Sequence, residues 1–206
     1  KNGYTVPFHY TAKNTWPVLQ RPGWLFGVIM KYWMNGGMPT RANYPEGMTE
    51  KFTHVSTAER KTKNDSLAWK DLQVLRDMWP GKLLVKGILT PKDAELAIAN
   101  GADGIVVSNH GGRNFDSSMA PIEVLPGIVD AVGHKTTVIV DSGFRRGSDI
   151  VKAMAMGAKA VLIGRGTLYG TAAAGQAGAA KAISIYREEI SRVMALIGCR
   201  SIAELN

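Results

Sequence analysis

The chain has 206 residues, enough to bury a substantial core, and 45% of them are hydrophobic. Its single cysteine, Cys199, excludes an internal disulfide, and no Cys/His cluster has the spacing of a zinc site, so we expect a reducing compartment and no metal. The formal net charge of +8 comes from scattered Lys and Arg residues, a pattern that argues against nucleic-acid binding and favours a phosphate-bearing cofactor, an acidic substrate or an anionic membrane surface.

Residues 1–64 are predicted to form a long loop or lid region, rich in aromatic residues, Pro and Gly. Residues 51–64 are polar, and we expect them to be mobile. Residues 24–34 are almost unbroken apolar sequence, too short to span a bilayer. They are predicted either to contact a membrane surface, with Trp and Tyr at the interface and Arg21 and Lys31 near anionic headgroups, or to form a helix packed against the folded domain or a sister subunit.

Residues 65–206 form a second region with the alternating pattern of parallel βαβ units. It opens with a predicted helix at residues 65–79, whose buried stripe is expected to contain Leu67, Leu72, Leu75 and Met78. Four short β-branched runs then predict strands buried on both faces, at residues 82–86, 104–108, 137–141 and 160–163. The fold class is therefore α/β with a parallel sheet.

The helices between these strands have recognisable starts and ends. A capping side chain or a first-turn Pro indicates helix starts at Thr90-Pro91, Pro121 and Ser148-Asp149. Gly101 and Gly157 are predicted to end two of these helices. A last helix is predicted at residues 177–197, where apolar residues recur at helical spacing with charged residues opposite them.

Charged or polar side chains that could act in binding or catalysis lie at or near the end of every predicted strand. In a parallel α/β fold, the loops at the carboxyl ends of the strands form the active site. These side chains are Lys86, Ser108, His110, Arg113, Asp141, Arg145 and Arg165. An imidazole can be neutral near pH 7 and accept a proton, so His110 is the predicted catalytic base. The planar guanidinium of Arg113 matches a carboxylate, so Arg113 is predicted to bind an acidic substrate together with His110.

Two glycine-rich segments predict a phosphate site. Residues 141–148 run from a strand into a helix start, and Gly164-Arg165-Gly166-Thr167 follows one βα unit later. Such loops let backbone N–H groups approach an anion, and the loops after strands seven and eight of a (β/α)₈ barrel commonly hold a phosphate. Arg145 and Arg165 would add charge-assisted hydrogen bonds, while Asp141 would accept from hydroxyl groups instead. Alternatively, Arg145 and Asp141 only pair with each other.

Lys86 is the other informative charge, because an ammonium in a buried strand is costly unless an anion or an electron-rich group accompanies it. In a flavin enzyme, a cation at the N1/O2 edge of the ring would stabilise the reduced, anionic form. A lysine in a barrel can equally form a Schiff base, as in aldolases. The residue alone leaves both roles open.

Together these motifs resemble the FMN-dependent 2-hydroxy-acid dehydrogenase/oxidase family, nearest to its lactate and mandelate dehydrogenases. The segments that carry the resemblance are LLVKGIL around Lys86, SNHGGRNFD from Ser108, DSGFRRGSDIVKAMAMGA from Asp141 and GRGTLYG from Gly164. The resemblance covers residues 65–206 and implies the carboxyl-terminal half of a (β/α)₈ TIM barrel, strands five to eight with their helices. It implies FMN as the cofactor, with Lys86 and Ser108 at the flavin, Asp141, Gly143, Arg145, Gly164 and Arg165 at the ribityl phosphate, and Ser142 beside them.

The activity that this resemblance implies is oxidation of a lactate-like or mandelate-like 2-hydroxy acid to the 2-keto acid. His110 would remove a proton as two electrons reach the flavin, by hydride transfer or through a carbanion, and Arg113 would bind the substrate carboxylate. A quinone or O₂ would then take the electrons. The alternatives are another phosphate-binding barrel enzyme of the Schiff-base aldolase type, using Lys86, or an inactive half-barrel that needs a partner chain.

Two departures from the family pattern stand out. Gly166 occupies a position where the family usually has Pro or Ala, which loosens the turn. The chain begins at Lys1, without an initiator Met or a signal-like segment and just after the expected fourth strand, so we expect the amino-terminal half of the barrel as a companion. We further expect a homo-oligomer, as a tetramer, in the cytoplasm, with a peripheral contact to the inner face of the cell membrane and no nucleic-acid partner.

Overall fold

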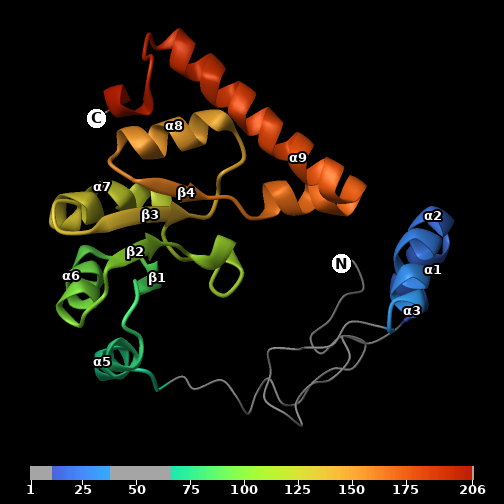
Figure 1. Cartoon of the computed structure of the whole chain (residues 1–206), viewed down its shortest axis with the longest axis horizontal. Helices are drawn as coiled ribbons and strands as arrows, with labels where there is room; N and C mark the ends of the chain where they lie inside the picture. Colours follow the sequence, from blue (N-terminus) through green and yellow to red (C-terminus); the bar gives the residue numbers. More distant parts are fainter. Residues whose placement is uncertain (1–10, 38–65, 206) are drawn as a thin grey trace. The chain divides into compact units, whose positions relative to one another are not determined.

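The computed structural model describes residues 11–37 and 66–205, drawn in colour in Figure 1. The chain divides between Ser66 and Leu67 into two compact units, which are taken separately below. The predicted mobile segment at residues 51–64 lies outside the described residues.

The second unit is built on a four-stranded parallel sheet with the strand order β1-β2-β3-β4 (Figure 1). The strands are β1 (Leu84–Ile88), β2 (Gly104–Val107), β3 (Thr137–Asp141) and β4 (Ala160–Leu162). They alternate with α6 (Pro91–Ala99), α7 (Pro121–Val132) and α8 (Gly147–Ala155). Each strand pairs with the next strand in the sequence. This is the strand order of a barrel, whereas in a doubly wound sheet the strand order reverses at a switch point.

The core lies where the sheet meets its helices. Side chains of the two central strands and of α7 are fully or almost fully buried there, among them Ile105, Val107, Leu125, Ile128, Val132, Val138 and Val140. The prediction that all four strands are buried on both faces is confirmed for β2 only. Leu84 in β1 and Leu162 in β4 are exposed, because these strands form the two edges of the sheet and each pairs on one side.

The predicted helix boundaries are mostly confirmed. The Thr90 hydroxyl accepts a hydrogen bond from the Asp93 N–H at 3.1 Å and caps α6, and Pro121 begins α7. Gly101 and Gly157, just beyond α6 and α8, adopt the left-handed backbone (φ 94° and 96°) that ends a helix. Helix α8 begins one residue before the predicted start, where the Asp149 carboxylate accepts from the N–H groups of residues 145 and 146 at 3.0 and 2.9 Å.

The first strand lies two residues later than predicted, at β1 rather than residues 82–86. The Asp103 carboxylate accepts hydrogen bonds from the side chains of Arg76 and Lys82 and from the Leu83 N–H, at 2.6, 2.9 and 2.9 Å. These bonds hold the start of the run to the turn before β2, so that regular pairing begins with Leu84. Lys86 consequently lies inside the strand and not at its end.

Helix α5 (Trp69–Met78) is shorter than the predicted helix, and its predicted buried stripe is largely wrong. Leu67, Leu75 and Met78 are exposed, whereas Trp69 and Leu72 pack against the core. Amphipathic spacing identified the helix but not the side that faces the sheet.

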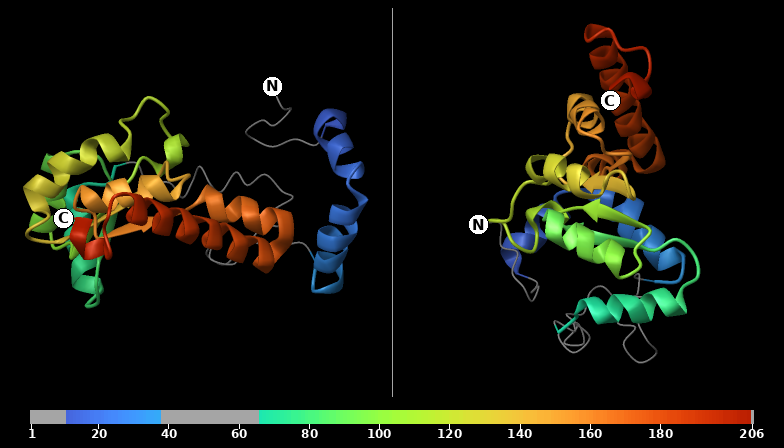
Figure 2. Two further views of the ribbon diagram at one scale, coloured as in Figure 1. Left: turned by 90° about the horizontal axis from the view of Figure 1, so that it is seen from above. Right: turned by 90° about the vertical axis from the view of Figure 1, so that its left-hand side faces the viewer.

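Helix α9 (Arg165–Leu196) comprises two helical segments separated at Ala174 and Gly175, whose backbone angles are not helical. The second segment corresponds to the helix predicted at residues 177–197, and the first was not predicted. The segments meet at Gly170 and Gly178, where a Cβ on either residue would overlap the backbone of the other. The second segment runs along α8, as Figure 2 shows, and the short η3 (Ile202–Leu205) follows it.

The first unit contains a nearly continuous helical stretch, α1 (Ala12–Leu19), α2 (Pro22–Trp24), the π-helical η1 (Leu25–Met30) and α3 (Lys31–Met34). The apolar run at residues 24–34 is thus helical, and its large side chains are exposed: Trp24, Phe26, Met30, Tyr32, Trp33 and Met34. Among residues 11–37 and 66–205, no helix has the length and apolar character needed to cross a bilayer.

Candidate active site

The loop after β2 turns sharply and carries His110 and Arg113. The Asn109 side chain stabilises this turn, because its oxygen accepts from the N–H groups of Gly111 and Gly112 at 3.1 and 3.2 Å. Its amide nitrogen donates to the Met119 carbonyl at 3.3 Å. Within the turn His110 has a left-handed backbone (φ 57°), which is uncommon for a residue with a side chain and persists where its surroundings hold it.

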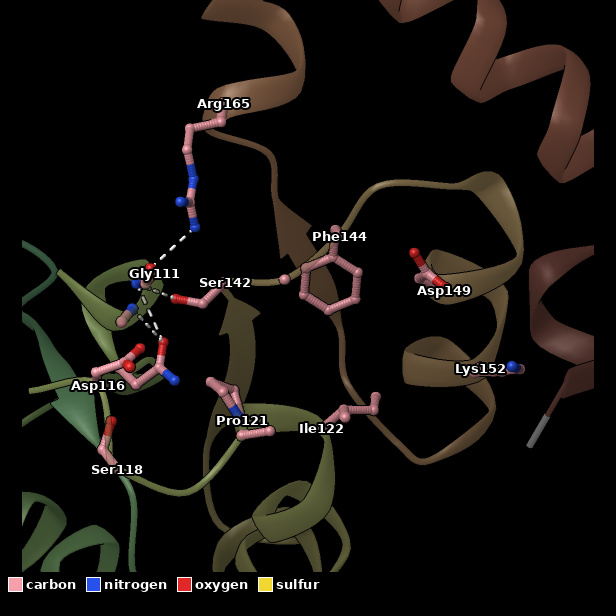
Figure 3. A pocket seen from close by; sticks show the side chains of 14 residues that line it. Gly111, Asp116, Ser118, Pro121, Ile122, Ser142, Phe144, Asp149, Lys152 and Arg165 are labelled. Atoms are coloured by element: carbon pink, nitrogen blue, oxygen red, sulfur yellow. Dashed lines mark hydrogen bonds between the residues drawn. The ribbon is translucent and has the colours of Figure 1, made fainter. Parts of the chain in front are cut away.

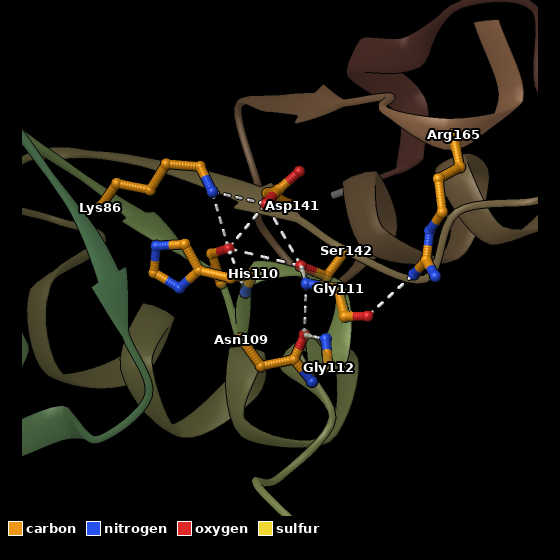
Figure 4. A network of polar contacts seen from close by, with 9 residues as sticks. Lys86, Asn109, His110, Gly111, Gly112, Asp141, Ser142 and Arg165 are labelled. Atoms are coloured by element: carbon orange, nitrogen blue, oxygen red, sulfur yellow. Dashed lines mark hydrogen bonds and ion pairs between the residues drawn. The ribbon is translucent and has the colours of Figure 1, made fainter. Parts of the chain in front are cut away.

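A polar network joins the middle of β1 to the ends of β2 and β3 (Figure 4). The Lys86 ammonium donates to Asp141 Oδ2 at 2.7 Å and to the Ser108 hydroxyl at 2.9 Å. Ser108, only 1% exposed, donates to Asp141 Oδ2 at 2.6 Å. The Ser142 hydroxyl accepts from the Gly111 N–H at 2.9 Å and donates to Asp141 Oδ2 at 3.2 Å, so it ties the His110 loop to the end of β3.

The charge of Asp141 is stabilised within this network. Partial burial would raise the pKa of the Asp141 carboxyl, but the hydrogen bonds from Lys86 and Ser108 and the positive charge of Lys86 outweigh burial and lower it below its ordinary value. Asp141 is therefore a carboxylate at neutral pH and keeps the Lys86 ammonium in place. The alternative pairing of Asp141 with Arg145 is wrong, because Lys86 is the cation that Asp141 contacts.

A cavity of about 910 Å³ opens above this network, at the carboxyl ends of the strands. Nine of the ten predicted site residues line it: Lys86, His110, Arg113, Asp141, Ser142, Gly143, Arg145, Gly164 and Arg165. The tenth, Ser108, is buried beneath them. Residues from strand β1 and from the segments that follow β2, β3 and β4 thus share one cavity, as expected for the site of a parallel α/β fold.

The His110 imidazole lies against β1. A Cβ at Gly87 would be 3.2 Å from His110 Cε1, closer than ordinary van der Waals contact, so a side chain at position 87 would crowd the ring. On the opposite wall, Arg165 Nη2 donates to the Gly111 carbonyl at 2.9 Å and links the loops after β2 and β4 (Figure 4). Arg113 and Arg145 are exposed and line the same cavity.

The glycine-rich loops after β3 and β4 leave their backbone accessible. A Cβ at Gly143 or at Gly164 would meet no atom within 4 Å, so both positions border open space in the cavity. With the guanidinium groups of Arg145 and Arg165 nearby, this donor set fits a phosphate. The cavity volume also lies in the range of cofactor sites.

A second cavity of about 510 Å³ adjoins the first (Figure 3). Ser142, Gly143, Phe144 and Arg165 border both cavities, whereas Asp116, Pro121, Ile122 and Lys152 line the second one alone. The loop after β3 therefore lies between the two cavities.

Sequence reasoning missed Asn109, although an Asn that precedes two nearby glycines is a signal for a side-chain-capped turn. It also missed Leu168 and Thr171, which line the cavity from the unpredicted first segment of α9. Among the residues that the structure describes, no group of three or more His, Cys, Asp or Glu side chains could hold a metal ion.

A family model described as FMN-dependent dehydrogenase matches residues 1–206. The chain belongs to this family. It is 42% identical over 205 residues to the (S)-mandelate dehydrogenase of Pseudomonas putida, a match that covers 100% of this chain and 50% of that protein. It is 51% identical over 140 residues to the L-lactate dehydrogenase of Azorhizobium caulinodans, covering 68% of this chain and 37% of that protein. The chain thus spans half or less of the length of these relatives.

Solved structures of the family agree with the fold. The crystal structure of the monotopic membrane protein (S)-mandelate dehydrogenase matches with a TM-score of 0.86 at 42% identity, covering 98% of this chain and 52% of that one. A mandelate oxidase structure matches with a TM-score of 0.65 at 42% identity, covering 68% of this chain and 42% of that one. The predicted family and the predicted α/β fold, with this chain as part of a barrel, are confirmed, and FMN is the cofactor to which the family points.

Proposed function

We propose that the protein containing this chain oxidises a lactate-like or mandelate-like 2-hydroxy acid to the 2-keto acid, with FMN as its cofactor. The observation that supports this proposal most strongly is the shared cavity, which combines an imidazole and a guanidinium on one loop with two phosphate-type loops opposite. Relatives named (S)-mandelate dehydrogenase and L-lactate dehydrogenase support the same substrate class.

The cofactor would be held by two groups of residues. Backbone N–H groups around Gly143 and Gly164, with the side chains of Arg145 and Arg165, would bind the phosphate, as their open positions at the cavity suggest. Lys86, oriented by Ser108 and by Asp141, would lie beside the flavin ring, and Ser142 would keep the adjoining loop in place. FMN, when bound, supplies the acceptor for two electrons.

The substrate would be held and deprotonated by the loop after β2. The Arg113 guanidinium would bind the substrate carboxylate through two parallel hydrogen bonds. Oxidation of the alcohol to the ketone removes two protons and two electrons from the substrate. His110 would take one of the protons, and the two electrons would pass to FMN with the second proton, as a hydride or after formation of a carbanion. The Asn109-capped turn fixes the spacing of the two side chains.

A visible spectrum of the purified protein, recorded anaerobically before and after addition of L-lactate or (S)-mandelate, tests this proposal. We expect flavin absorbance at the start and bleaching of that absorbance by at least one of the two acids. A protein that contains flavin but is not bleached by any 2-hydroxy acid would contradict it. Reoxidation of the bleached protein, by a quinone analogue under anaerobic conditions or by O₂, then identifies the electron acceptor.

The aldolase alternative is disfavoured by the surroundings of Lys86. An amine must be neutral to attack a carbonyl, whereas the Lys86 nitrogen is ion-paired with Asp141 at 2.7 Å. Treatment with borohydride and a ketone or aldehyde substrate would trap a Schiff base, and we expect no adduct on Lys86. An adduct on Lys86 would support the aldolase alternative.

We also propose that residues beyond this chain complete the barrel, because the chain spans about half of its (S)-mandelate dehydrogenase relative and both edges of its sheet carry exposed Leu side chains. Active material should therefore contain a further segment of similar size, on the same or a second polypeptide. A lone species of this mass with full turnover would contradict this. Light scattering on the active material tests the expected tetramer.

Finally, we propose a peripheral membrane contact through residues 24–34. The exposed apolar side chains of this helical stretch and the structural relative described as a monotopic membrane protein support it. Deletion of residues 24–34 should move the protein from the membrane fraction to the soluble fraction and abolish flotation with anionic vesicles. Unchanged partition would reject this surface as the contact and favour its packing within the protein.

A further inference from the structure

Tyr186 connects α9 to the loop that follows β3. Its side chain is in the second segment of α9, and the residue is 7% exposed. The hydroxyl donates to the Phe144 carbonyl at 3.1 Å. Phe144 stands between Gly143 and Arg145, so a contact at this carbonyl fixes the backbone of the loop proposed to hold the FMN phosphate.

The same phenol fills the space beside the loop that follows β4. Gly166 comes directly after Arg165, and a Cβ at position 166 would overlap the Tyr186 hydroxyl oxygen and lie 3.0 Å from two carbons of its ring. Gly166 and Tyr186 are therefore sterically matched. Gly166 departs from the usual family pattern, and here the Tyr186 ring occupies the space in which a side chain at position 166 would lie.

A second contact fixes the loop after β3 further along. Glu189, three residues after Tyr186 on α9, accepts from the Gly147 N–H at 2.7 Å and pairs with the Arg146 guanidinium at 2.8 Å. The Tyr186 phenol is protonated at neutral pH and can donate, and burial raises its pKa further above the ordinary value of 10.0. Residues 144–147 are thus anchored to α9 at both ends.

We infer that Tyr186 is a positioning residue for the cofactor phosphate, which sets the distance between the loop around Gly143 and Arg145 and the loop around Gly164 and Arg165. The inference rests on the proposed FMN site. The phenol contacts the loop after β3 at Phe144 and the first turn of α9 at Gly166, and each of these residues adjoins a proposed phosphate ligand. Tyr186 is not among the residues that line the cavity. Its loss should therefore affect the phosphate and leave the flavin ring contacts unchanged.

The test compares affinities for FMN and for riboflavin, which lacks the phosphate, by quenching of flavin fluorescence with the whole protein after flavin removal. Tyr186→Phe removes one hydrogen bond and should weaken FMN binding about threefold to tenfold while riboflavin binding changes little. Gly166→Ala should weaken FMN binding further, because the new methyl group displaces the phenol. Tyr169→Phe is the matched control, since it removes an exposed hydroxyl from the same helix and should change neither affinity.

A double variant separates positioning from general damage. In Gly166→Ala combined with Tyr186→Leu, the smaller side chain makes room for the methyl group, so FMN affinity should recover relative to Gly166→Ala alone. Thermal unfolding of each variant identifies any that fail to fold. Equal weakening of FMN and riboflavin, or an unchanged affinity for FMN in Tyr186→Phe, would overturn the inference.

Failure of the inference and failure of the proposed site can be told apart. Arg145→Ala and Arg165→Ala remove proposed phosphate ligands and should lower FMN affinity relative to riboflavin whatever Tyr186 does. If these two variants behave as expected while Tyr186→Phe does not, only the role of Tyr186 is wrong. If neither arginine variant discriminates FMN from riboflavin, the phosphate site itself is wrong.

Discussion

Two stretches of similar apolar character have opposite environments in this molecule. In the second unit, Ile105, Val107 and Ile128 are completely buried between the sheet and α7. In the first unit, Trp33 is 84% exposed and Met34 is 77% exposed within a helical stretch that is equally apolar. The difference lies in the packing partners. A central strand has neighbours on both sides and a helix above it, whereas the large apolar side chains at residues 24–34 lack such cover among residues 11–37 and 66–205.

This contrast indicates that the two units contribute different properties to the protein. The buried strands fix the positions of the polar side chains at their carboxyl ends, which is the arrangement that the proposed catalytic site would need. The exposed helical stretch contributes apolar surface, which suits contact with a membrane or another protein. Changes in the two units should therefore alter different measurements.

The largest effect is expected at His110, the proposed catalytic base. His110→Ala should lower the rate of flavin reduction by a 2-hydroxy acid by roughly 10²- to 10⁴-fold, because the proton acceptor is lost. Flavin should stay bound and membrane partition should not change. Stopped-flow absorbance under anaerobic conditions measures the rate. Turnover at the unmodified rate would remove His110 from its proposed role.

The contrast in burial can be tested by matched truncations. Ile128→Ala leaves a cavity in the core and should lower the free energy of unfolding by about 2–5 kcal/mol. Trp33→Ala, although it removes a larger side chain, should change that free energy by about 0.5 kcal/mol or less. Denaturant titration of both variants gives the values. A large loss in Trp33→Ala would show that the first unit buries this residue in the complete protein.

An intermediate effect is expected at Arg113, which is proposed to bind the substrate carboxylate. Arg113→Lys retains the charge but loses the planar fork, so kcat/KM for the hydroxy acid should fall roughly tenfold to a hundredfold, equivalent to about 1.4–3 kcal/mol of binding to the transition state. Steady-state kinetics measures this ratio, and the FMN content of the variant should equal that of the parent protein. Unchanged kcat/KM would place the substrate carboxylate elsewhere.

The smallest effect concerns stability in acid. Hydrogen bonds from Lys82, from the Leu83 N–H and from Arg76 lower the pKa of Asp103 well below its ordinary value. The unfolded chain then binds a proton more readily than the folded chain, so this contribution to stability is complete above the ordinary pKa of 3.8 and declines as pH falls below it. Asp103→Asn should therefore be less stable than the parent at pH 7, and the difference should shrink as the pH is lowered.

Thermal unfolding between pH 7 and pH 2.5 checks this sign, with Asp77→Asn as the control, since Asp77 lies on the exposed side of the same helix that supplies Arg76. A difference between parent and Asp103→Asn that grows toward acid pH would contradict the role of Asp103 as a charged clamp.

Prediction from the sequence succeeded where a short-range pattern was sufficient. The strands at Thr137–Asp141 and Gly104–Val107 are apolar runs between turn residues, and the helix starts at Thr90 and Pro121 are local capping signals. It failed where a distant residue decides the outcome. The start of β1 is moved by the bonds of Asp103, and the side of α5 that is buried depends on the sheet to which it packs.

The sequence by itself determined the order of strands and helices, the loops that carry His110, Arg113 and the two phosphate-type glycine segments, and the family of the chain, since each of these is written in contiguous residues. Only the tertiary structure decided that Asp141 pairs with Lys86 and not with Arg145, and that Tyr186 occupies the space beside Gly166. Such contacts join residues that are far apart in the chain. They depend on how the helices pack on the sheet, and local sequence patterns do not specify that packing.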